Sequence, residues 1–393
     1  MRPIRLGQFT DSYPPVINGV STFVAEHHGE LLSHAHDAHV FTFGYLKYSD
    51  DQRNVWRSFA MPLGTSQFRM WPRLDRRSYQ AACSMNILHI HEALGIGHLG
   101  LRIAKQHGLP FVFTNHTRHD LYALHYPPVV RAFVLKYITW AIRQFVRASM
   151  LTTVASRDAA HWLQALVPDA TDKICVMHNG ISINVRDRSV GLPDRGALHI
   201  RADQTLFIYV GRVTPEKNLE VLAKAMVRAV GLGANVHWLI IGAGSARHQI
   251  ESMVHSIRAR VSFLGALAHA EVPHYLNMAD VFITASLSEV NPLSVIEALA
   301  CQKPYVGLKA AWWDEFVNEN GAQAGVLCDH DPDQLAAAIK HVADDKAAQG
   351  RMGQQAKLLS RNFDIHNVTA QWIEIYQNIE AAAQRWGGKG VRN

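Results

Sequence analysis

The chain has 393 residues, of which 48% are hydrophobic and 18% are charged. This length predicts two domains, each with its own core, and the composition is that of a soluble globular enzyme rather than a disordered or fibrous protein. Four widely separated cysteines without a C-x-x-C pair argue against a disulfide framework and favour a reduced, cytoplasmic protein. We expect no membrane-spanning helix and no signal peptide, because no apolar run is long enough.

The charge is distributed unevenly along the chain. Residues 1–190 carry 20 Lys and Arg against 13 Asp and Glu, whereas the remainder carries 19 against 20. The first half is therefore the basic one, which is an argument about its partner rather than about its fold.

Short apolar strands alternate with helical segments throughout the first half, which predicts a parallel α/β domain. We predict strands at residues 4–9, 39–43, 87–90, 109–114, 151–155 and 174–177, and helices at 21–32, 97–106 and 129–147. Residues 46–80 are less regular, with a possible strand at 55–63.

Two loops after predicted strands in this half are candidates for ligand contact. The first contains Pro14, Pro15, Asn18 and Gly19, and Gly19 lets the backbone approach a ligand as in strand-to-helix phosphate loops. A plain glycine turn is the alternative. The second is T-N-H-T, where His116 lies beyond the carboxyl end of a strand, the usual place for ligands in open α/β sheets. A core or capping histidine is the alternative there.

Two basic segments are candidates for contact with an anionic partner. The segment Arg69–Arg77 has an interleaved aromatic residue, but we interpret it as a solvated loop. In the helix at 129–147, Lys136, Arg143 and Arg147 fall within about 40° of one another at 100° per residue, with Trp140 beside them. Such a strip can lie on anionic lipid, or it can be the wet edge of a buried helix.

The second half follows a polar linker at about residues 185–202 and repeats the alternation. We predict strands at 206–210, 236–241, 261–264, 281–284 and 304–308, and helices at 273–278, 293–300, 334–343 and 368–382. Gly211, Arg212 and Lys217 follow the first of these strands. A backbone turn with one fixed and one mobile cation suits a diphosphate, although a surface ion-pair pattern has the same spacing.

The stretch from residue 281 to 300 contains the strongest candidate site. A buried strand leads into a polar turn, and Asn291 and Pro292 are typical of an N-cap and a first helical position. The helix is expected to begin at about Leu293, with its first amides forming an anion site. Glu289 precedes it and Glu297 lies inside it. Carboxylates accept hydrogen bonds from hydroxyls, and the helix start binds phosphate, so the implied ligand has hydroxyls at both ends and phosphate in its middle, as a nucleotide sugar does. An ordinary surface helix with two solvated glutamates is the alternative.

These residues resemble a known family. Glu289 and Glu297, separated by seven residues in S-L-S-E-V-N-P-L-S-V-I-E-A-L-A, are similar to the signature of the family-four retaining glycosyltransferases. Gly211, Arg212 and Lys217 match that family's G-R-x-x-x-x-K element, whose cations hold the diphosphate of the donor. The opening D-S-Y-P-P-V-I-N-G-V resembles members that glycosylate the lipids diacylglycerol or phosphatidylinositol.

The resemblance implies an α/β GT-B fold, with two Rossmann-like, doubly wound domains facing across a cleft. The expected parts are an acceptor-binding domain at 1–190, a nucleotide-sugar-binding domain at 191–367, and a terminal helix at 368–393 that crosses back to the first domain. The implied site residues fall into two groups, catalytic and donor-binding. The catalytic group is His116, Arg212, Lys217 and Glu289, and the donor-binding group is Gly19, Gly211, Asn291, Pro292, Leu293, Ser294 and Glu297.

The implied reaction is retaining transfer of a hexose from a nucleotide-diphosphate sugar to an acceptor such as a membrane lipid. A soluble sugar or small-molecule acceptor, a nucleotide-sugar epimerase on the same fold, and a nucleotide-binding protein without chemistry are the alternatives. We expect no cofactor beyond the donor substrate, no metal, even at Asp329 and Asp331, and no nucleic-acid partner. The expected location is the cytoplasm, with peripheral contact on the inner face of the membrane through Lys136, Arg143 and Arg147.

The sequence departs from the family pattern at two places. His178 stands where the family usually has proline in P-N-G-I-D, with Ser182 in place of the aspartate. The family's G-G-x-x-E has Ala311 and Trp312 in place of the glycine pair, followed by Trp313. We expect this bulk to reshape the sugar pocket, so the identity of the donor cannot be taken from the average family member.

Overall fold

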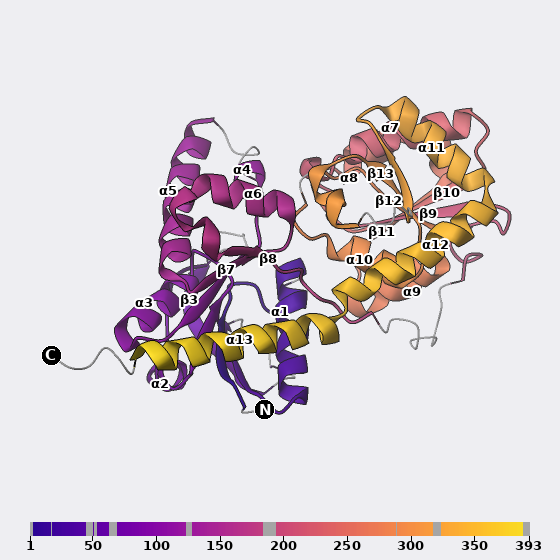
Figure 1. The fold of residues 1–393 in the computed structure, drawn as a ribbon. Helices are drawn as coiled ribbons and strands as arrows, with labels where there is room; N and C mark the ends of the chain where they lie inside the picture. The colour runs from indigo at the N-terminus through magenta and orange to yellow at the C-terminus, as the bar shows by residue number, and fades with distance from the viewer. Residues whose placement is uncertain are drawn as a thin grey trace. The chain divides into compact units, whose positions relative to one another are not determined.

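The computed structural model describes residues 3–16, 18–44, 50, 53–62, 69–122, 128–183, 194–287, 289–316 and 324–387. The chain divides into two compact units, which are residues 1–181 with 365–393 (unit 1) and residues 182–364 (unit 2) (Figure 1). The domain boundary predicted between residues 190 and 191 lies outside the described residues.

Unit 1 contains an eight-stranded sheet in the order β4-β3-β2-β1-β5-β6-β7-β8. Neighbouring strands are parallel except β3 and β4, which are antiparallel. The strands are β1 (Arg5–Phe9), β2 (Asp37–Phe43), β3 (Val55–Pro62), β4 (Arg69–Arg73), β5 (Ile87–Ile90), β6 (Phe111–Asn115), β7 (Leu151–Val154) and β8 (Ile174–Val176).

Strand β4 corrects one expectation. The basic segment Arg69–Arg77 was expected to be a solvated loop, but its first five residues pair with β3 as a strand. An edge strand has unpaired N–H and C=O groups, and the antiparallel return of the chain satisfies those of β3. Short-range charge patterning gives no information about such a long-range partner.

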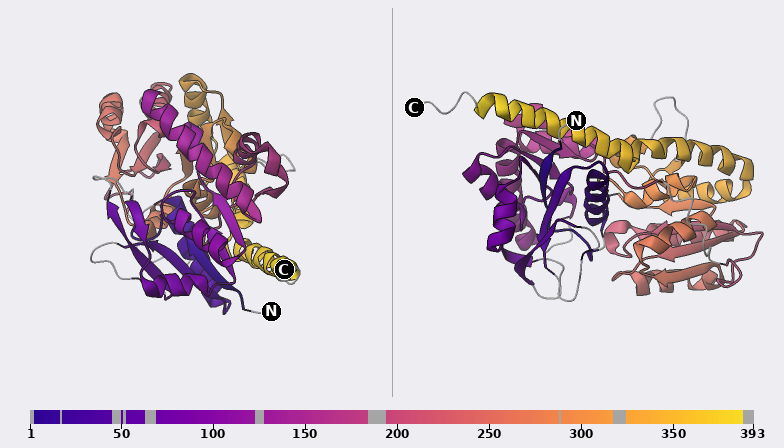
Figure 2. Two further views of the ribbon diagram at one scale, coloured as in Figure 1. Left: turned by 90° about the vertical axis from the view of Figure 1, so that its left-hand side faces the viewer. Right: turned by 90° about the horizontal axis from the view of Figure 1, so that it is seen from below.

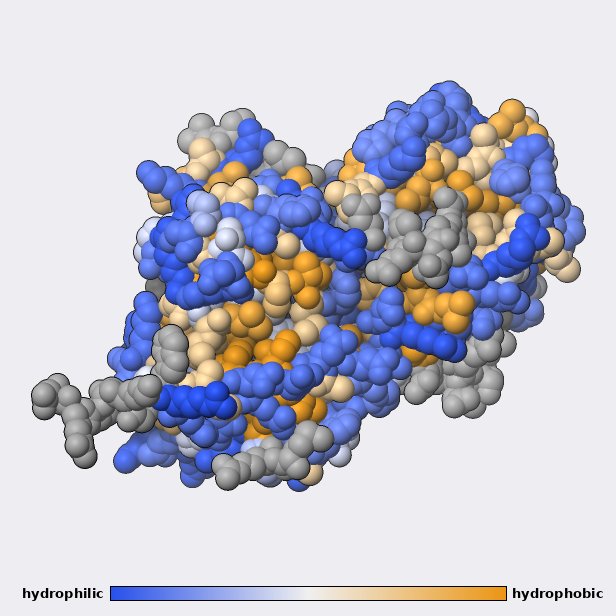
Figure 3. All heavy atoms as spheres, viewed as in Figure 1, coloured by the Kyte–Doolittle hydropathy of each residue, from blue (hydrophilic) through white to orange (hydrophobic). Residues whose placement is uncertain are grey.

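The helices of unit 1 include one from the far end of the chain. They are α1 (Gly19–Ser33), α2 (Arg76–Cys83), α3 (Gly97–His107), α4 (His119–Tyr122), α5 (Pro128–Ala148), α6 (Arg157–Leu166) and α13 (Ile365–Gly387). Helix α13 packs against α1 and β5 (Figures 1 and 2). Its Val368, Trp372 and Tyr376 are buried in the core of unit 1, whereas hydrophilic residues line much of its outer face (Figure 3). An amphipathic period of 3.6 residues explains this division.

Unit 2 contains a six-stranded sheet, parallel throughout, in the order β11-β10-β9-β12-β13-β14. Its strands are β9 (Thr205–Val210), β10 (Val236–Ile241), β11 (Val261–Gly265), β12 (Val281–Thr284), β13 (Tyr305–Leu308) and β14 (Gly325–Cys328). Its helices are α7 (Leu219–Gly231), α8 (Arg247–Met253), α9 (Val272–Met278), α10 (Leu293–Ala300), α11 (Pro332–Asp344) and α12 (Lys346–Ser360). Strand β14 and helices α8 and α12 were not predicted, and no bounds were predicted for α7.

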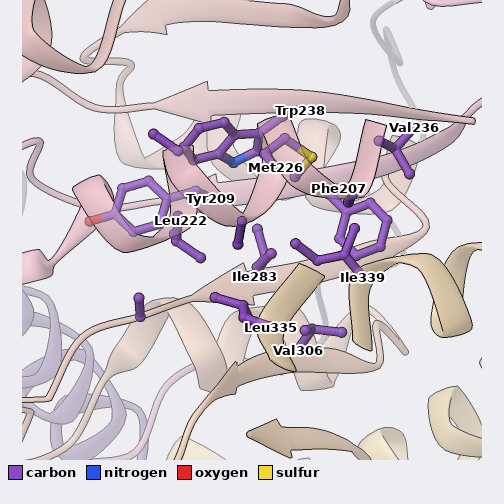
Figure 4. Packing of buried hydrophobic residues seen from close by; sticks show 14 of the residues in the cluster. Phe207, Tyr209, Leu222, Met226, Val236, Trp238, Ile283, Val306, Leu335 and Ile339 are labelled. Carbon is purple, nitrogen blue, oxygen red and sulfur yellow. The ribbon is translucent and has the colours of Figure 1, made fainter. Parts of the chain in front are cut away.

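The main core of unit 2 lies between its sheet and helices α7 and α11. Leu222 on α7 and Leu335 on α11 meet Phe207 and Trp238, which project from the sheet (Figure 4). All four side chains are fully buried, and burying a large apolar side chain stabilises the fold by about 1.5–3 kcal/mol. This packing holds β9 in place, and β9 carries one of the candidate loops at its end.

Both sheets are doubly wound, which confirms the predicted class of two Rossmann-like α/β domains. In unit 1 the strand order reverses between β1 and β5, and in unit 2 it reverses between β9 and β12. Loops at such a switch point diverge at the carboxyl ends of the strands and leave room for a ligand. The candidate residues that follow β1, β9 and β12 therefore lie where this fold class binds ligands.

Candidate active site

The loop after β9 is shaped by a glycine. Gly211 has φ of +156°, and a Cβ there would lie 2.8 Å from the Tyr209 hydroxyl oxygen. That hydroxyl donates to the Arg212 carbonyl oxygen at 2.8 Å. The chain then makes a short 3₁₀ turn over Pro215–Lys217, followed by Asn218 in the left-handed region. This backbone sets Arg212 and Lys217 on the turn where both were expected.

Lys217 and Glu289 form an ion pair in unit 2. Lys217 Nζ lies 2.5 Å from Glu289 Oε1, and their side chains are only 14% and 18% exposed. Burial is the largest single effect and would raise the pKa of Glu289. The charge and hydrogen bond of Lys217, the Ser286 hydrogen bond and the Arg212 charge together outweigh it, so the net pKa is lowered and the carboxylate is ionised. Asn218 Nδ2 also donates to the Ala285 carbonyl oxygen at 3.3 Å. The loops after β9 and β12 are thus joined across the switch point.

Arg212 is the more exposed cation of the two. Its guanidinium lies 3.0 Å from Glu216 Oε1, and its side chain is 55% exposed. Glu216 also accepts from the Thr214 hydroxyl at 2.7 Å. Burial would raise the pKa of Glu216. The Thr214 hydrogen bond and the charges of Arg212 and Lys217 have the larger combined effect, so the pKa is lowered overall. An exposed guanidinium in a surface ion pair can turn toward an anionic ligand at little cost.

Helix α10 begins at Leu293, as expected, but its cap differs from the prediction. The N-cap is Pro292, with an extended ψ of 97°, so Asn291 lies one residue before the cap. The correction has a local cause, since an extended Pro292 delays the helical turn by one residue. Pro292 and Leu293 are buried, while Ser294 is partly exposed. The amides of the first helical residues lie beside the loop that carries Glu289.

Glu297 has a partner that the sequence did not reveal. The residue is 6% exposed on α10, and its Oε1 lies 2.6 Å from His269 Nε2. His269 begins the 3₁₀ turn after β11 and is 48% exposed at its side chain. A buried carboxylate that faces a half-exposed imidazole can exchange that partner for ligand hydroxyls. The only sequence signal for His269 is its position shortly after a strand end.

Trp312 and Trp313 are part of the interior of unit 2. They stack at 4.1 Å between ring centroids and are 2% and 1% exposed. The indole of Trp312 donates to the Ser286 carbonyl oxygen at 3.2 Å, and that of Trp313 donates to the Leu308 carbonyl oxygen at 2.8 Å. Trp312 therefore anchors the start of the loop that carries Glu289, and Trp313 is bonded to the end of β13.

Gly19 occupies a different position from the one expected. It is the first residue of α1 rather than part of the preceding loop, because Asn18 is the N-cap and its Oδ1 accepts from the Ser21 amide at 2.8 Å. Gly19 is exposed, so it remains accessible at the start of that helix.

His116 follows β6 in unit 1 and belongs to a buried cluster of imidazoles. Its Nε2 lies 3.0 Å from His91 Nδ1, and Asn179 Nδ2 lies 3.4 Å from its Nδ1. His91 Nε2 in turn lies 3.3 Å from Gln8 Oε1. Burial lowers the pKa of His116 to about 3, so the ring is neutral at physiological pH. The sequence predicted His116 but not the residues around it.

Two carboxyl groups at the switch point of unit 1 were also missed. Asp11 Oδ1 accepts from the Ile96 amide at 2.8 Å, and Glu92 Oε2 accepts from the Asp11 amide at 3.0 Å. Burial raises the pKa of Asp11 to about 7 and that of Glu92 well above its usual range, with the Asp11 charge adding to the latter. A proton is thus available on this pair near neutral pH, at the carboxyl ends of β1 and β5.

The basic strip on α5 is smaller than predicted, and it has aromatic neighbours. Arg147 pairs with Asp169 at 2.8 Å, and Arg143 Nε donates to the Leu166 carbonyl oxygen. Lys136 is exposed. The exposed large aromatic residues on this helix are Phe133, Tyr137 and Trp140, at 76%, 48% and 52%.

None of the helices that the structure describes is long and apolar enough to cross a membrane. Likewise, the described residues contain no group of three or more His, Cys, Asp or Glu side chains that could hold a metal ion. Asp329 and Asp331 have structural contacts instead. Asp329 pairs with Lys309 at 2.8 Å, and Asp331 caps α11.

Comparison with known proteins gives two family matches. Residues 193–359 match "Glycosyl transferases group 1", and residues 17–185 match "Glycosyltransferase Family 4". An alpha-monoglucosyldiacylglycerol synthase from Acholeplasma laidlawii is 24% identical over 387 residues, which are 92% of this chain and 93% of that protein. A glycogen synthase from Mycobacterium tuberculosis is 26% identical over 354 residues, covering 88% of this chain and 79% of that protein.

Solved structures show the same fold. A sucrose-phosphate synthase from Thermosynechococcus elongatus superposes with a TM-score of 0.78 at 19% identity, over 97% of this chain and all of that one. The Anabaena protein HepE in complex with UDP and glucose gives 0.73 at 18% identity, over 95% of this chain and all of that one. The two family matches together span most of the sequence, and the chain belongs to the group 1, family 4 glycosyltransferases with the GT-B fold.

Proposed function

We propose that the protein transfers a hexose from a nucleotide-diphosphate sugar to a membrane lipid, with retention of the anomeric configuration and without a metal. The observation that carries the proposal is the Lys217–Glu289 pair at the switch point of unit 2, with the start of α10 beside it. It combines a cation for phosphate, an ionised carboxylate for hydroxyls and a helix N-terminus within one loop system.

The proposed roles follow from charge. Arg212, Lys217 and the first amides of α10 stabilise the negative charge that develops on the departing diphosphate. Glu289 accepts hydrogen bonds from the sugar hydroxyls, and Glu297 accepts them from the ribose once His269 yields. Because cations and amides already supply positive charge, a chelator should leave the transfer rate unchanged.

His116 is proposed to contact the sugar near the anomeric carbon. As a neutral ring it can exchange a hydrogen bond with a hydroxyl without adding charge to the diphosphate site. Retention is proposed through attack of the acceptor hydroxyl on the face from which the diphosphate departs.

A lipid acceptor is supported by two independent observations. The relative from Acholeplasma laidlawii is named for synthesis of a glucosylated diacylglycerol. In addition, Phe133, Tyr137, Trp140 and Lys136 lie within about 100° of arc on α5. Exposed aromatic rings beside a cation are typical of a helix that lies in a lipid headgroup region. We propose that this face meets the inner surface of an anionic membrane.

Vesicle binding tests this face directly. Replacing Phe133, Tyr137 and Trp140 together by serine should weaken binding to anionic vesicles by at least tenfold, because the apolar contact is lost. Phe59 is 71% exposed on β3, which makes Phe59→Ser the matched control. Equal weakening in both proteins would remove the basis for α5 as the contact.

A saccharide acceptor is the second candidate. It is favoured by the similarity to a glycogen synthase over 88% of this chain. Comparison of diacylglycerol in vesicles with soluble oligosaccharides as acceptors separates the two. Product from the oligosaccharide alone would reject the lipid proposal and leave the donor proposal intact.

The donor proposal is tested by thermal unfolding with UDP, GDP, ADP and their sugars, in the presence of a chelator. A ligand at 100 times its dissociation constant adds about 2.7 kcal/mol to the folded state. A selective shift with one base identifies the nucleotide. Absence of any shift would contradict the donor site, and NMR of the sugar product then decides between retention and inversion when transfer is seen.

A further inference from the structure

The imidazole of His116 is held by a chain of hydrogen bonds that runs through unit 1. The chain connects Asn179, His116, His91 and Gln8, at the carboxyl ends of β8, β6 and β5 and inside β1. Gln8 and His91 are 0% and 1% exposed, and Asn179 is 6% exposed. Only His116 in this set is conventionally a site residue of the proposed reaction. The other three are unexplained by it.

The two ends of the chain specify one direction. At one end Gln8 presents its carbonyl oxygen Oε1, which can only accept, so His91 Nε2 carries the hydrogen. At the other end Asn179 presents its amide nitrogen Nδ2, which can only donate, so His116 Nδ1 is the acceptor.

The tautomers of His91 and His116 must then be consistent with both ends of the chain, and they are. Burial lowers the pKa of His91 well below its usual range and that of His116 to about 3, so each neutral ring carries one hydrogen. With its hydrogen on Nε2, His91 accepts at Nδ1, and His116 donates to it from Nε2 across 3.0 Å. That leaves the lone pair of His116 on Nδ1, in agreement with the direction set by Asn179.

We propose that His91 and Gln8 are positioning residues that hold His116 in its Nε2–H tautomer, so that His116 presents Nδ1 to its ligand as a hydrogen-bond acceptor. The contact from Asn179 to that nitrogen is 3.4 Å, longer than an ordinary N–H hydrogen bond, so a ligand hydroxyl can replace the Asn179 amide as the donor to Nδ1. The hydroxyl belongs to the transferred sugar or to the acceptor alcohol, and both present the same chemistry. This rests on the proposed function.

A second layer supports the chain from behind. His89 stacks against His91 with 3.9 Å between ring centroids. His89 Nδ1 lies 2.7 Å from the Tyr376 hydroxyl on α13, and His89 Nε2 lies 2.6 Å from the Thr114 hydroxyl. The terminal helix therefore contributes to the same arrangement, because it holds the ring on which His91 rests.

The variant pair His91→Leu and His91→Asn tests the proposal. Leucine removes the acceptor for His116 Nε2–H, whereas the asparagine carbonyl oxygen can take the place of His91 Nδ1. We expect His91→Leu to lower kcat about tenfold with the KM for the nucleotide sugar within twofold, and His91→Asn to recover most of that loss. His28→Leu is the matched control. That histidine is 0% exposed, and neither ring nitrogen has a partner among the described residues.

Long-range ¹H–¹⁵N NMR of the ring nitrogens reads the tautomer in the unmodified protein, with His116 assigned by comparison with His116→Gln. The expected spectrum shows an unprotonated Nδ1 and a protonated Nε2. A protonated Nδ1 would mean that the chain runs in the opposite direction and would overturn the proposal. Equal activity loss in His91→Asn and His91→Leu would overturn it as well. The NMR result does not depend on turnover, so failure of the proposed function would remain distinguishable.

Discussion

The Lys217–Glu289 pair predicts an effect with an unusual sign. The carboxylate lies 2.5 Å from the ammonium and neutralises the cation that is proposed to bind diphosphate. Glu289→Gln removes that competing charge while keeping the shape of the side chain. The affinity for a nucleoside diphosphate should therefore rise, even though transfer of the sugar becomes slower because Glu289 no longer binds its hydroxyls.

The magnitude follows from the geometry of the pair. A hydrogen bond to a charged group contributes about 1.5–3 kcal/mol, and we expect the lower end because the glutamine amide oxygen can still accept a hydrogen bond from Lys217. We expect a tightening of about tenfold, which corresponds to about 1.4 kcal/mol. Lys217→Met should weaken binding by at least tenfold. Glu289→Gln should tighten binding less in the Lys217→Met background than in the wild type, since part of the effect of Glu289 on the diphosphate passes through Lys217.

Isothermal titration with the nucleoside diphosphate that stabilises the wild-type protein measures all three variants. Unfolding curves for each variant serve as the control that substitution in the loops after β9 and β12 has not unfolded the protein. Weaker binding by Glu289→Gln would refute the reasoning, because it would show that Glu289 itself holds the nucleotide.

Three further predictions concern stability, each measured by urea unfolding. Burial lowers the pKa of His28 to about 4 from 6.5, so its contribution to stability is present above pH 6.5 and is lost as the pH falls. Between pH 7 and pH 5, the free energy of unfolding of His28→Leu should therefore fall by about 2 kcal/mol less than that of the wild type. Parallel plots of unfolding free energy against pH would contradict this. Tyr376→Phe removes the hydroxyl that contacts His27 Nε2 and His89 Nδ1 and should cost about 1–3 kcal/mol, so an unchanged midpoint would speak against those bonds. Trp312→Ala should destabilise unit 2 by about 3–5 kcal/mol because the site cannot collapse, and a cost below 1 kcal/mol would mean that the indole is not packed as described.

Much of the secondary structure is determined by local sequence and could therefore be predicted. The strand at Ile87–Ile90 and the helix start at Leu293 agree with the expected residues, because apolar periodicity and turn residues act over short distances. The glycosyltransferase family followed from the spacing of Glu289 and Glu297 and from the turn at Gly211. Each of those motifs lies within one short stretch of the chain, so it can be recognised without knowledge of the tertiary structure.

Contacts between distant segments were decided only by the tertiary structure. Strand β4 pairs with the outer edge of β3, and His269 reaches Glu297 because the turn after β11 leads into α9, which packs against α10. The polar groups around His116 come from β1, β5 and β8, and Tyr376 is 287 residues from the His89 ring that it contacts. Sequence patterns report which face of an element is buried. They carry no information on which buried polar group will meet which, since that depends on the order and register of strands in the folded sheet.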